Sequence, residues 1–122
     1  MATVLIIEDD TQVRVLAESI FQDAGYTTLS AGTLTEAHAI LQSDQPIDLV
    51  FTDMTLVDEQ EAGLQIGQSA AQVRAGVPVI YTTARGVTDG MRALFVEPHR
   101  FVPKPWTPDQ VLTAATELLS KA

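Results

Sequence analysis

The feature that most constrains the fold of this chain is a regular alternation between two hydrophobic periods. Val4–Ile7 is a short uninterrupted apolar run, which is typical of a strand covered on both faces. Apolar residues then recur three and four positions apart from Val13 to Ala24, which predicts a helix ended by Gly25. The following segment, Tyr26–Ala31, predicts a second strand.

The alternation continues to the end of the chain. Further strands are expected at 48–53, 77–82 and 100–103, and further helices after the capping box Thr33 to Glu36, at 64–73 and from the cap Thr107 to Leu119. The segment 86–98 is irregular and puts its helix in doubt. Strands alternating with helices predict an α/β fold, a doubly wound five-stranded parallel sheet with helices on both faces. Because 122 residues is the usual size of one domain, residues 1–122 are expected to form a single domain.

Composition excludes several classes of function. The chain has no cysteine, which rules out disulfides, thiol redox chemistry and cysteine-ligated metals. Its formal net charge is −9 and its seven basic residues are scattered, so direct nucleic-acid binding is not expected. No apolar run approaches the roughly 20 residues of a membrane span, and the apolar start lacks the basic flank of a signal peptide. A cytoplasmic protein without a membrane partner is therefore expected.

Polar residues follow the predicted strands at their carboxyl ends. These residues are Glu8, Asp9 and Asp10 after the first strand, Asp53 and Thr55 at the third, Thr82 and Thr83 at the fourth, and Lys104 after the fifth. In a parallel sheet these ends meet at one edge, where ligands bind. Several carboxylates at one edge need a neutralising cation, and Mg²⁺ is the hard ion that suits them. The pattern predicts phosphoryl transfer, with Asp53 as a carboxylate nucleophile.

Each of these residues also has a simpler interpretation when it is taken alone. Asp10 alone is better explained as a helix cap, and a turn former is an alternative for Asp53. The threonines fit a strand by propensity, and Lys104 fits a solvated loop. Only their coincidence at one edge favours a functional site.

Four segments carry a resemblance to a known family. VLIIEDD, DLVFTDM, PVIYTTA and FVPKPW resemble, in order, the landmarks of the response-regulator receiver domain of two-component signalling. The separations also agree, with 44 positions from Asp9 to Asp53, 30 from Asp53 to Thr83 and 21 from Thr83 to Lys104. The resemblance covers essentially the whole chain and implies a flavodoxin-like strand order, 2-1-3-4-5.

The resemblance also implies a role for each matching residue. Asp53 would be the phosphoacceptor, and Thr83 and Lys104 would contact the phosphoryl group. Mg²⁺ would be bound by Glu8, Asp9, Asp53 and the main-chain carbonyl of Thr55. Phe101 would be the aromatic switch residue, although an aromatic at the start of a strand is more often a packing residue. Pro105 matches a proline that in the family usually follows a cis peptide.

The sequence departs from the family pattern beside the phosphoacceptor. The usual proline four positions on is Val57, and the intervening loop gains the acids Asp58, Glu59 and Glu61. Three alternatives are open for these acids: they slow phosphorylation, they strengthen cation binding, or they point into solvent, which is the expectation. The pair Thr82-Thr83 leaves two candidates for the switch threonine, of which the spacing to Lys104 favours Thr83.

The resulting expectation is a phosphorylation-gated signalling domain and not a turnover enzyme. A histidine kinase or phosphotransfer protein would supply the phosphoryl group, and with no output domain after Ala122 the readout would be an unknown output protein, a homodimer or phosphate relay. One alternative is a pseudo-receiver that binds partners constitutively. Another is a magnesium-dependent phosphohydrolase, which commonly needs a second Asp where Thr55 stands. A flavodoxin-type cofactor carrier is disfavoured by the acids after the first strand.

Overall fold

The computed structural model describes residues 2–56 and 59–120. Within them, five parallel strands form one sheet in the order β2-β1-β3-β4-β5, as the family resemblance implied. The strands are β1 (Thr3–Ile7), β2 (Thr27–Ala31), β3 (Leu49–Asp53), β4 (Val79–Thr82) and β5 (His99–Phe101). The helices are α1 (Thr11–Asp23), α2 (Leu34–Leu41), α3 (Ala62–Val73), α4 (Asp89–Ala93) and α5 (Pro108–Leu119).

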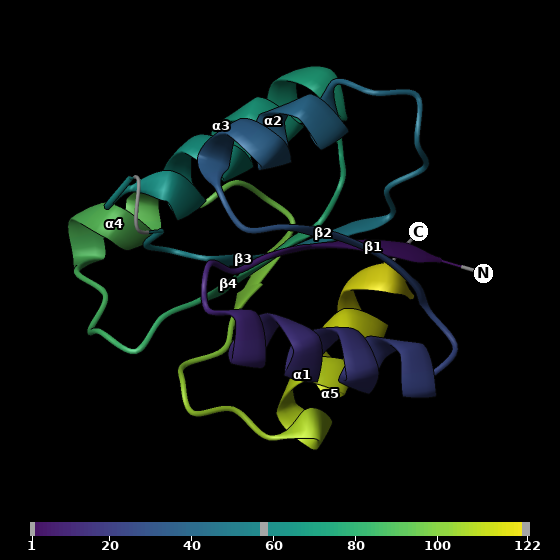
Figure 1. Cartoon of the computed structure of the whole chain (residues 1–122). Helices are drawn as coiled ribbons and strands as arrows, with labels where there is room; N and C mark the ends of the chain where they lie inside the picture. Colours follow the sequence, from purple (N-terminus) through teal and green to yellow (C-terminus); the bar gives the residue numbers. More distant parts are fainter. Residues whose placement is uncertain (1, 57–58, 121–122) are drawn as a thin grey trace.

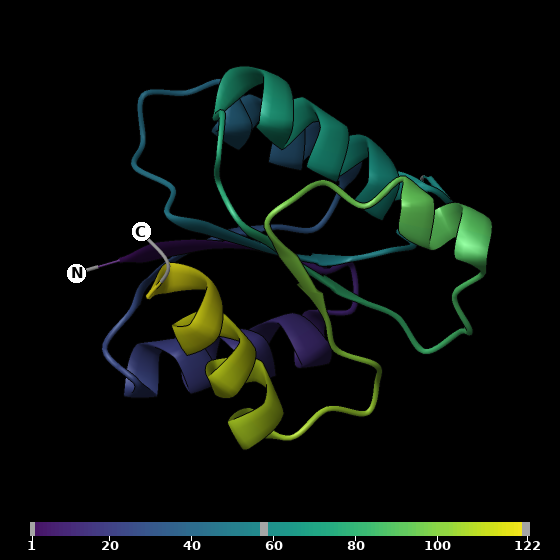
Figure 2. The ribbon, with the colours of Figure 1, turned by 180° about the vertical axis from the view of Figure 1, so that it is seen from behind.

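The helices cover both faces of the sheet. α1 and α5 lie on one face, α2 and α3 lie on the other, and the short α4 lies beyond the end of α3 (Figure 1). The view from behind shows β5 at the edge of the sheet, between α4 and α5 in the chain (Figure 2). The doubly wound α/β architecture predicted from the hydrophobic periods is therefore confirmed.

Alternating residues of each strand enter two separate cores. In β1, Leu5 and Ile7 pack in the core under α2 and α3, whereas Val4 and Ile6 pack in the core under α1 and α5. All four side chains are fully buried. The continuous apolar run therefore reflects burial on both faces, which is the usual condition of a parallel strand.

Local signals set most helix ends. Asp10 caps α1 by accepting hydrogen bonds from the N–H groups of Gln12 and Val13, and Thr107 forms the expected capping box with Gln110. α3 begins at Ala62, two residues before the expected start at 64.

The part of the chain that the structure describes contains no helix long and apolar enough to cross a membrane.

Candidate functional site

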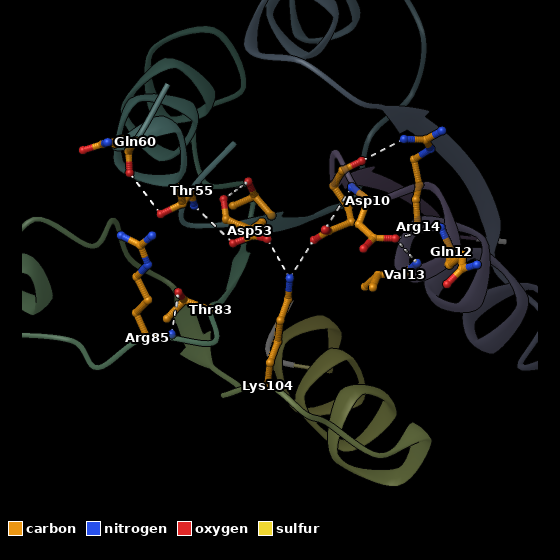
Figure 3. Close-up of polar contacts among 12 residues, drawn as sticks. Asp10, Gln12, Val13, Arg14, Asp53, Thr55, Gln60, Thr83, Arg85 and Lys104 are labelled. Atoms are coloured by element: carbon orange, nitrogen blue, oxygen red, sulfur yellow. Dashed lines mark hydrogen bonds and ion pairs between the residues drawn. The ribbon is translucent and has the colours of Figure 1, made fainter. Parts of the chain in front are cut away.

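The carboxyl edge of the sheet brings together two buried acids and one lysine. Asp53 is the last residue of β3, and Glu8 directly follows β1; they are 7% and 2% exposed. The ammonium nitrogen of Lys104 lies 2.6 Å from Asp53 Oδ2 and 3.0 Å from Glu8 Oε2. Figure 3 shows the Lys104 side chain reaching from the far side of the site to Asp53. Residues 96 positions apart in the chain thus share one pocket.

The acids also form a cluster suited to a divalent cation. Glu8, Asp9 and Asp53 each offer a carboxylate oxygen, and these oxygens lie within 4.8 Å of one another. Three carboxylate oxygens are the hard donors that Mg²⁺ prefers, so the residues present fit that ion. Thr55 lies beside them, because its N–H donates to Asp53 Oδ1 at 3.1 Å. The four residues expected to bind Mg²⁺ are therefore neighbours.

Burial and the neighbouring charges shift the pKa values of Glu8 and Lys104. Burial, together with the hydrogen bond to Asp53 and the repulsion from it, raises the pKa of Glu8 from 4.5 to about 7. Lys104 acts in the opposite direction on Glu8 but does not outweigh burial. Burial by itself would lower the pKa of Lys104, yet its hydrogen bonds to Asp53 and Glu8 raise that pKa above the usual value. The lysine therefore stays charged beside acids that compete for it.

Both candidate switch threonines are buried at the end of β4. Thr83 Oγ1 accepts a hydrogen bond from the N–H of Arg85 at 3.1 Å, and the Thr83 carbonyl accepts one from the N–H of Lys104 at 3.0 Å. Thr82 pairs in register with Asp53, but its hydroxyl has no hydrogen-bond partner among the described residues. Figure 3 shows Thr83 and Asp53 on neighbouring strand ends.

Phe101 lies outside the acidic pocket, on β5, and is half-buried. Its ring stacks on the ring of Phe95, with centroids 6.2 Å apart and planes 22° apart. The guanidinium of Arg92, from α4, lies 5.4 Å from the centroid of the Phe101 ring. The structure therefore places Phe101 against α4, whereas Asp53, Thr83 and Lys104 lie together.

Sequence reasoning assigned no role to Arg14, which nevertheless contacts the acidic turn. Its Nη1 donates to the main-chain carbonyl of Glu8 at 2.9 Å. The sequence feature that could have indicated this contact is a basic residue one turn into the helix that follows the acids. Val57 and Asp58, part of the atypical loop, lie outside the described residues.

An apolar groove adjoins the pocket. Its volume is about 460 Å³, and it is lined by Val13, Leu16, Ala84, Lys104, Pro105 and Trp106. Leu16 is 52% exposed there. Lys104 lines the groove and also contacts the acids, so the groove lies next to the acidic pocket.

Comparisons with known proteins agree with this arrangement. Residues 4–116 match the family model described as "Response regulator receiver domain". Relatives include the phosphate regulon transcriptional regulatory protein PhoB of Pseudomonas aeruginosa, 26% identical over 98% of this chain and 52% of PhoB. Another is the transcriptional regulatory protein AruR of the same species, 29% identical over 97% of this chain and 49% of AruR. The chain spans about half the length of these curated relatives.

Solved structures have the same fold. A response regulator receiver protein from Sinorhizobium medicae matches with a TM-score of 0.89 at 25% identity, over 98% of this chain and 94% of that one. The response regulator protein TrrA of Thermotoga maritima, solved in complex with Mg(2+)-BeF, matches with a TM-score of 0.81 at 21% identity, over 98% of this chain and 100% of that one.

Proposed function

This chain belongs to the response regulator receiver domain family, and we propose that Asp53 is the residue that accepts its phosphoryl group. Receiver domains of this family typically carry a phosphorylatable aspartate. The observation that supports Asp53 is its position, buried at the end of β3 with Lys104 Nζ 2.6 Å from its carboxylate and with Glu8 and Asp9 beside it. Residues 1–122 would act as one receiver domain.

The acidic cluster supports a magnesium site, as receiver domains generally bind this ion. The proposed ligands are Glu8, Asp9, Asp53 and the main-chain carbonyl of Thr55. Bound Mg²⁺ would neutralise charge on the acids and on the phosphoryl oxygens.

Asp53 acts as the nucleophile in the proposed reaction. A carboxylate oxygen of Asp53 forms a bond to the phosphorus of a phosphohistidine, and the bond from phosphorus to the imidazole nitrogen breaks. The electron pair of that bond stays with the imidazole nitrogen, and Asp53 becomes an acyl phosphate. The same substitution on acetyl phosphate releases acetate.

Lys104 and Thr83 respond to the new charge. Lys104, already charged and within hydrogen-bond distance of Asp53, can pair with a phosphoryl oxygen after only a small movement. The Thr83 hydroxyl can donate a hydrogen bond to a second phosphoryl oxygen. The Thr83 carbonyl already accepts from the N–H of Lys104, so movement of one residue is transmitted to the other. A local change of charge thereby shifts the surface that contains Phe101.

The phosphodonor is proposed to be a histidine kinase or a phosphotransfer protein. Receiver domains interact with such kinases and with output domains, so the domain serves signalling and not turnover of a metabolite. The groove is the proposed docking surface for this donor, because it is apolar and is lined by the lysine that contacts Asp53. The readout is proposed to be an output domain or protein, or a homodimer, and the proposed location is the cytoplasm.

The pseudo-receiver alternative is less well supported, because the acids, Thr83 and Lys104 are all present and neighbouring. The phosphohydrolase alternative lacks its second acid, since Thr55 stands two positions after Asp53 and donates its hydroxyl to the Gln60 carbonyl. Turnover of a simple phosphate monoester by the purified chain would favour the phosphohydrolase.

The direct test is mass spectrometry after incubation with acetyl phosphate and Mg²⁺. The wild-type chain is expected to gain one acid-labile phosphoryl group, as an acyl phosphate would be. Asp53→Asn should gain none, while Asp48→Asn, which changes an acid outside the pocket, should be labelled like the wild type. Labelling that persists in Asp53→Asn refutes the assignment.

A further inference from the structure

We infer that Arg14 is a positioning residue for the magnesium site, acting through the main chain of Glu8 and not as a ligand. This inference rests on the proposed function, because it concerns the site formed by Glu8, Asp9 and Asp53. Arg14 lies in the first turns of α1, and Figure 3 shows its side chain extending from the helix back to the turn that holds the acids.

The peptide groups of Glu8 are fixed on two sides. The Glu8 N–H donates to the Ala31 carbonyl on β2 at 3.0 Å. The Glu8 carbonyl accepts from Arg14 Nη1 at 2.9 Å. That carbonyl belongs to the peptide bond joining Glu8 to Asp9, so the guanidinium sets the orientation of the peptide from which Asp9 begins.

The residue after Asp9 is fixed as well. The Asp10 side chain caps α1, and the Asp10 N–H donates to Glu8 Oε1 at 3.2 Å. The Arg14 N–H donates to the Asp10 carbonyl at 2.8 Å. This second bond is the ordinary backbone bond of the first helical turn, so the side-chain bond to the Glu8 carbonyl is the contact that depends on the arginine. Ligands held in this way lose little conformational entropy when a metal binds.

Gly32 provides the space that the guanidinium needs. A Cβ atom built on Gly32 would lie 3.0 Å from Arg14 Nη1 and 3.5 Å from Glu36 Oε1. The first distance is too short for an ordinary contact, and the atom in the way is the far end of a flexible side chain. Gly32→Ala therefore requires the guanidinium to shift by a few tenths of an ångström, which is expected to weaken its hydrogen bond to the Glu8 carbonyl while leaving its charge on the protein.

A positioning role and a purely electrostatic role of Arg14 predict opposite changes in Mg²⁺ affinity when the arginine is removed. If Arg14 acted only as a positive charge near the acids, its removal would strengthen Mg²⁺ binding, since one repulsive charge is lost. If Arg14 positions the turn, its removal weakens binding, because the carbonyl is released. Changes to groups that orient metal ligands typically lower affinity, and we expect about a tenfold loss for Arg14→Gln.

The test measures Mg²⁺ binding to the whole chain without any phosphodonor. Mg²⁺ is titrated into the wild type, Arg14→Gln, Gly32→Ala and the charge control Arg100→Gln, which removes an exposed arginine paired with Glu117. Binding is followed by Trp106 fluorescence and by the rise in Tm that Mg²⁺ produces. Arg14→Gln and Gly32→Ala should both bind more weakly than the wild type, and Arg100→Gln should not.

The outcomes separate this inference from the proposed function. Failure of the wild type to bind Mg²⁺ refutes the metal site itself. If the wild type binds, equal or tighter binding by Arg14→Gln overturns the positioning role, as does wild-type affinity in Gly32→Ala. Should Arg14→Gln not fold by circular dichroism, Gly32→Ala decides, because the arginine and its charge remain.

Discussion

The ammonium nitrogen of Lys104 lies 2.6 Å from Asp53 Oδ2, close enough for a charge-assisted hydrogen bond. The same nitrogen also contacts Glu8, so a single lysine neutralises part of the charge of two buried acids. Before Mg²⁺ binds, Lys104 is a cation in direct contact with both acids.

Lys104→Gln is expected to destabilise the metal-free protein at pH 8. Removing one partner of a buried ion pair leaves an uncompensated charge, and the expected loss in the free energy of unfolding is about 3 kcal/mol. Mg²⁺ should restore much of this loss, because it neutralises the same acids. Urea unfolding with and without Mg²⁺ measures both effects.

The control for this substitution is Arg100→Gln. Arg100 and Glu117 form an exposed pair with N and O 3.4 Å apart, so its removal should change the free energy of unfolding by less than about 1 kcal/mol. Equal losses for the two variants, or no rescue of Lys104→Gln by Mg²⁺, would contradict the role given to Lys104.

Mg²⁺ affinity is expected to rise with pH and to level off above about pH 7. The pKa of Glu8 is about 7 in the folded chain, raised from 4.5 chiefly by burial. Below that pH a proton occupies the carboxyl that the metal needs, so each bound ion must displace it. Because the folded state binds this proton more tightly than the unfolded state, the contribution of Glu8 to metal-free stability falls as pH rises from about 4.5 to about 7. Titrations of Mg²⁺ from pH 5.5 to 8.5 measure the dependence.

Glu8→Gln provides the matched control, since glutamine keeps the shape of the side chain but does not titrate in this range. Its Mg²⁺ affinity should be weaker than that of the wild type at pH 8 and nearly independent of pH. A wild-type affinity that is flat across pH 7 would show that the proton on Glu8 does not compete with the metal.

The two neighbouring threonines are expected to differ in their response to loss of the hydroxyl. The buried Thr82 hydroxyl has no hydrogen-bond partner among the described residues, so Thr82→Val should raise the free energy of unfolding by about 1 kcal/mol. Thr83→Val should lower it by about 1 kcal/mol, because the Arg85 N–H loses its acceptor. Urea unfolding of the two variants gives both values.

The same pair of variants tests which threonine transmits phosphorylation. Both should still be labelled by acetyl phosphate, since Asp53 is unchanged. The backbone amide NMR shifts of Phe101 on phosphorylation should be preserved in Thr82→Val and reduced in Thr83→Val. The reverse pattern would make Thr82 the switch residue.

The sheet and the acidic pocket could be predicted because their signals are local or follow from topology. Continuous apolar runs such as Val4–Ile7 mark strands buried on both faces, and parallel strands bring their carboxyl ends to one edge. Once the strands are ordered, Glu8 and Asp53 lie at the ends of neighbouring strands, whereas Lys104 follows β5, two strands from β3, and reaches Asp53 through its long side chain. Topology alone therefore predicts that Glu8 and Asp53 are close, and the length of the lysine side chain completes the pocket.

The remaining features depend on contacts that no local pattern encodes. The contact of Arg14 with the Glu8 carbonyl requires the space left by Gly32, which lies on another turn. The early start of α3 follows a bridge between Leu56 and Glu59, and Gly63 lets the helix approach Met54 so closely that a Cβ would lie 2.7 Å from Met54 Cα. α4 has five residues and none is buried, so its apolar pattern is too weak to identify.

Gly67 weakened the prediction of α3, and the structure gives the reason for a glycine inside that helix. A Cβ on Gly67 would lie 2.2 Å from the hydroxyl oxygen of Tyr81. Tyr81 cannot easily move away, because its ring stacks on Phe95 with centroids 4.1 Å apart and its hydroxyl accepts from the Val96 N–H at 3.0 Å. Space at Gly67 therefore lets Tyr81 connect α3 to the segment after α4.

Gly67→Ala is accordingly expected to destabilise the chain although alanine favours helix. Overpacking against Tyr81 should cost about 2 kcal/mol, more than the ~1 kcal/mol that alanine gains over glycine in a helix. Tyr81→Phe alone should cost about 1 kcal/mol through the lost hydrogen bond to Val96. Gly90→Ala is the matched control, since a Cβ there meets nothing closer than 3.9 Å.

The double variant Gly67→Ala/Tyr81→Phe tests whether the hydroxyl is the obstacle. Removing the hydroxyl leaves the alanine methyl with 3.2 Å to the nearest ring carbon, which a slight shift of the ring can relieve. The double variant should therefore be more stable than the sum of the single losses predicts, by at least about 1 kcal/mol. Urea unfolding of all four proteins closes this cycle. Strictly additive losses would mean that Tyr81 is not what excludes a side chain at Gly67.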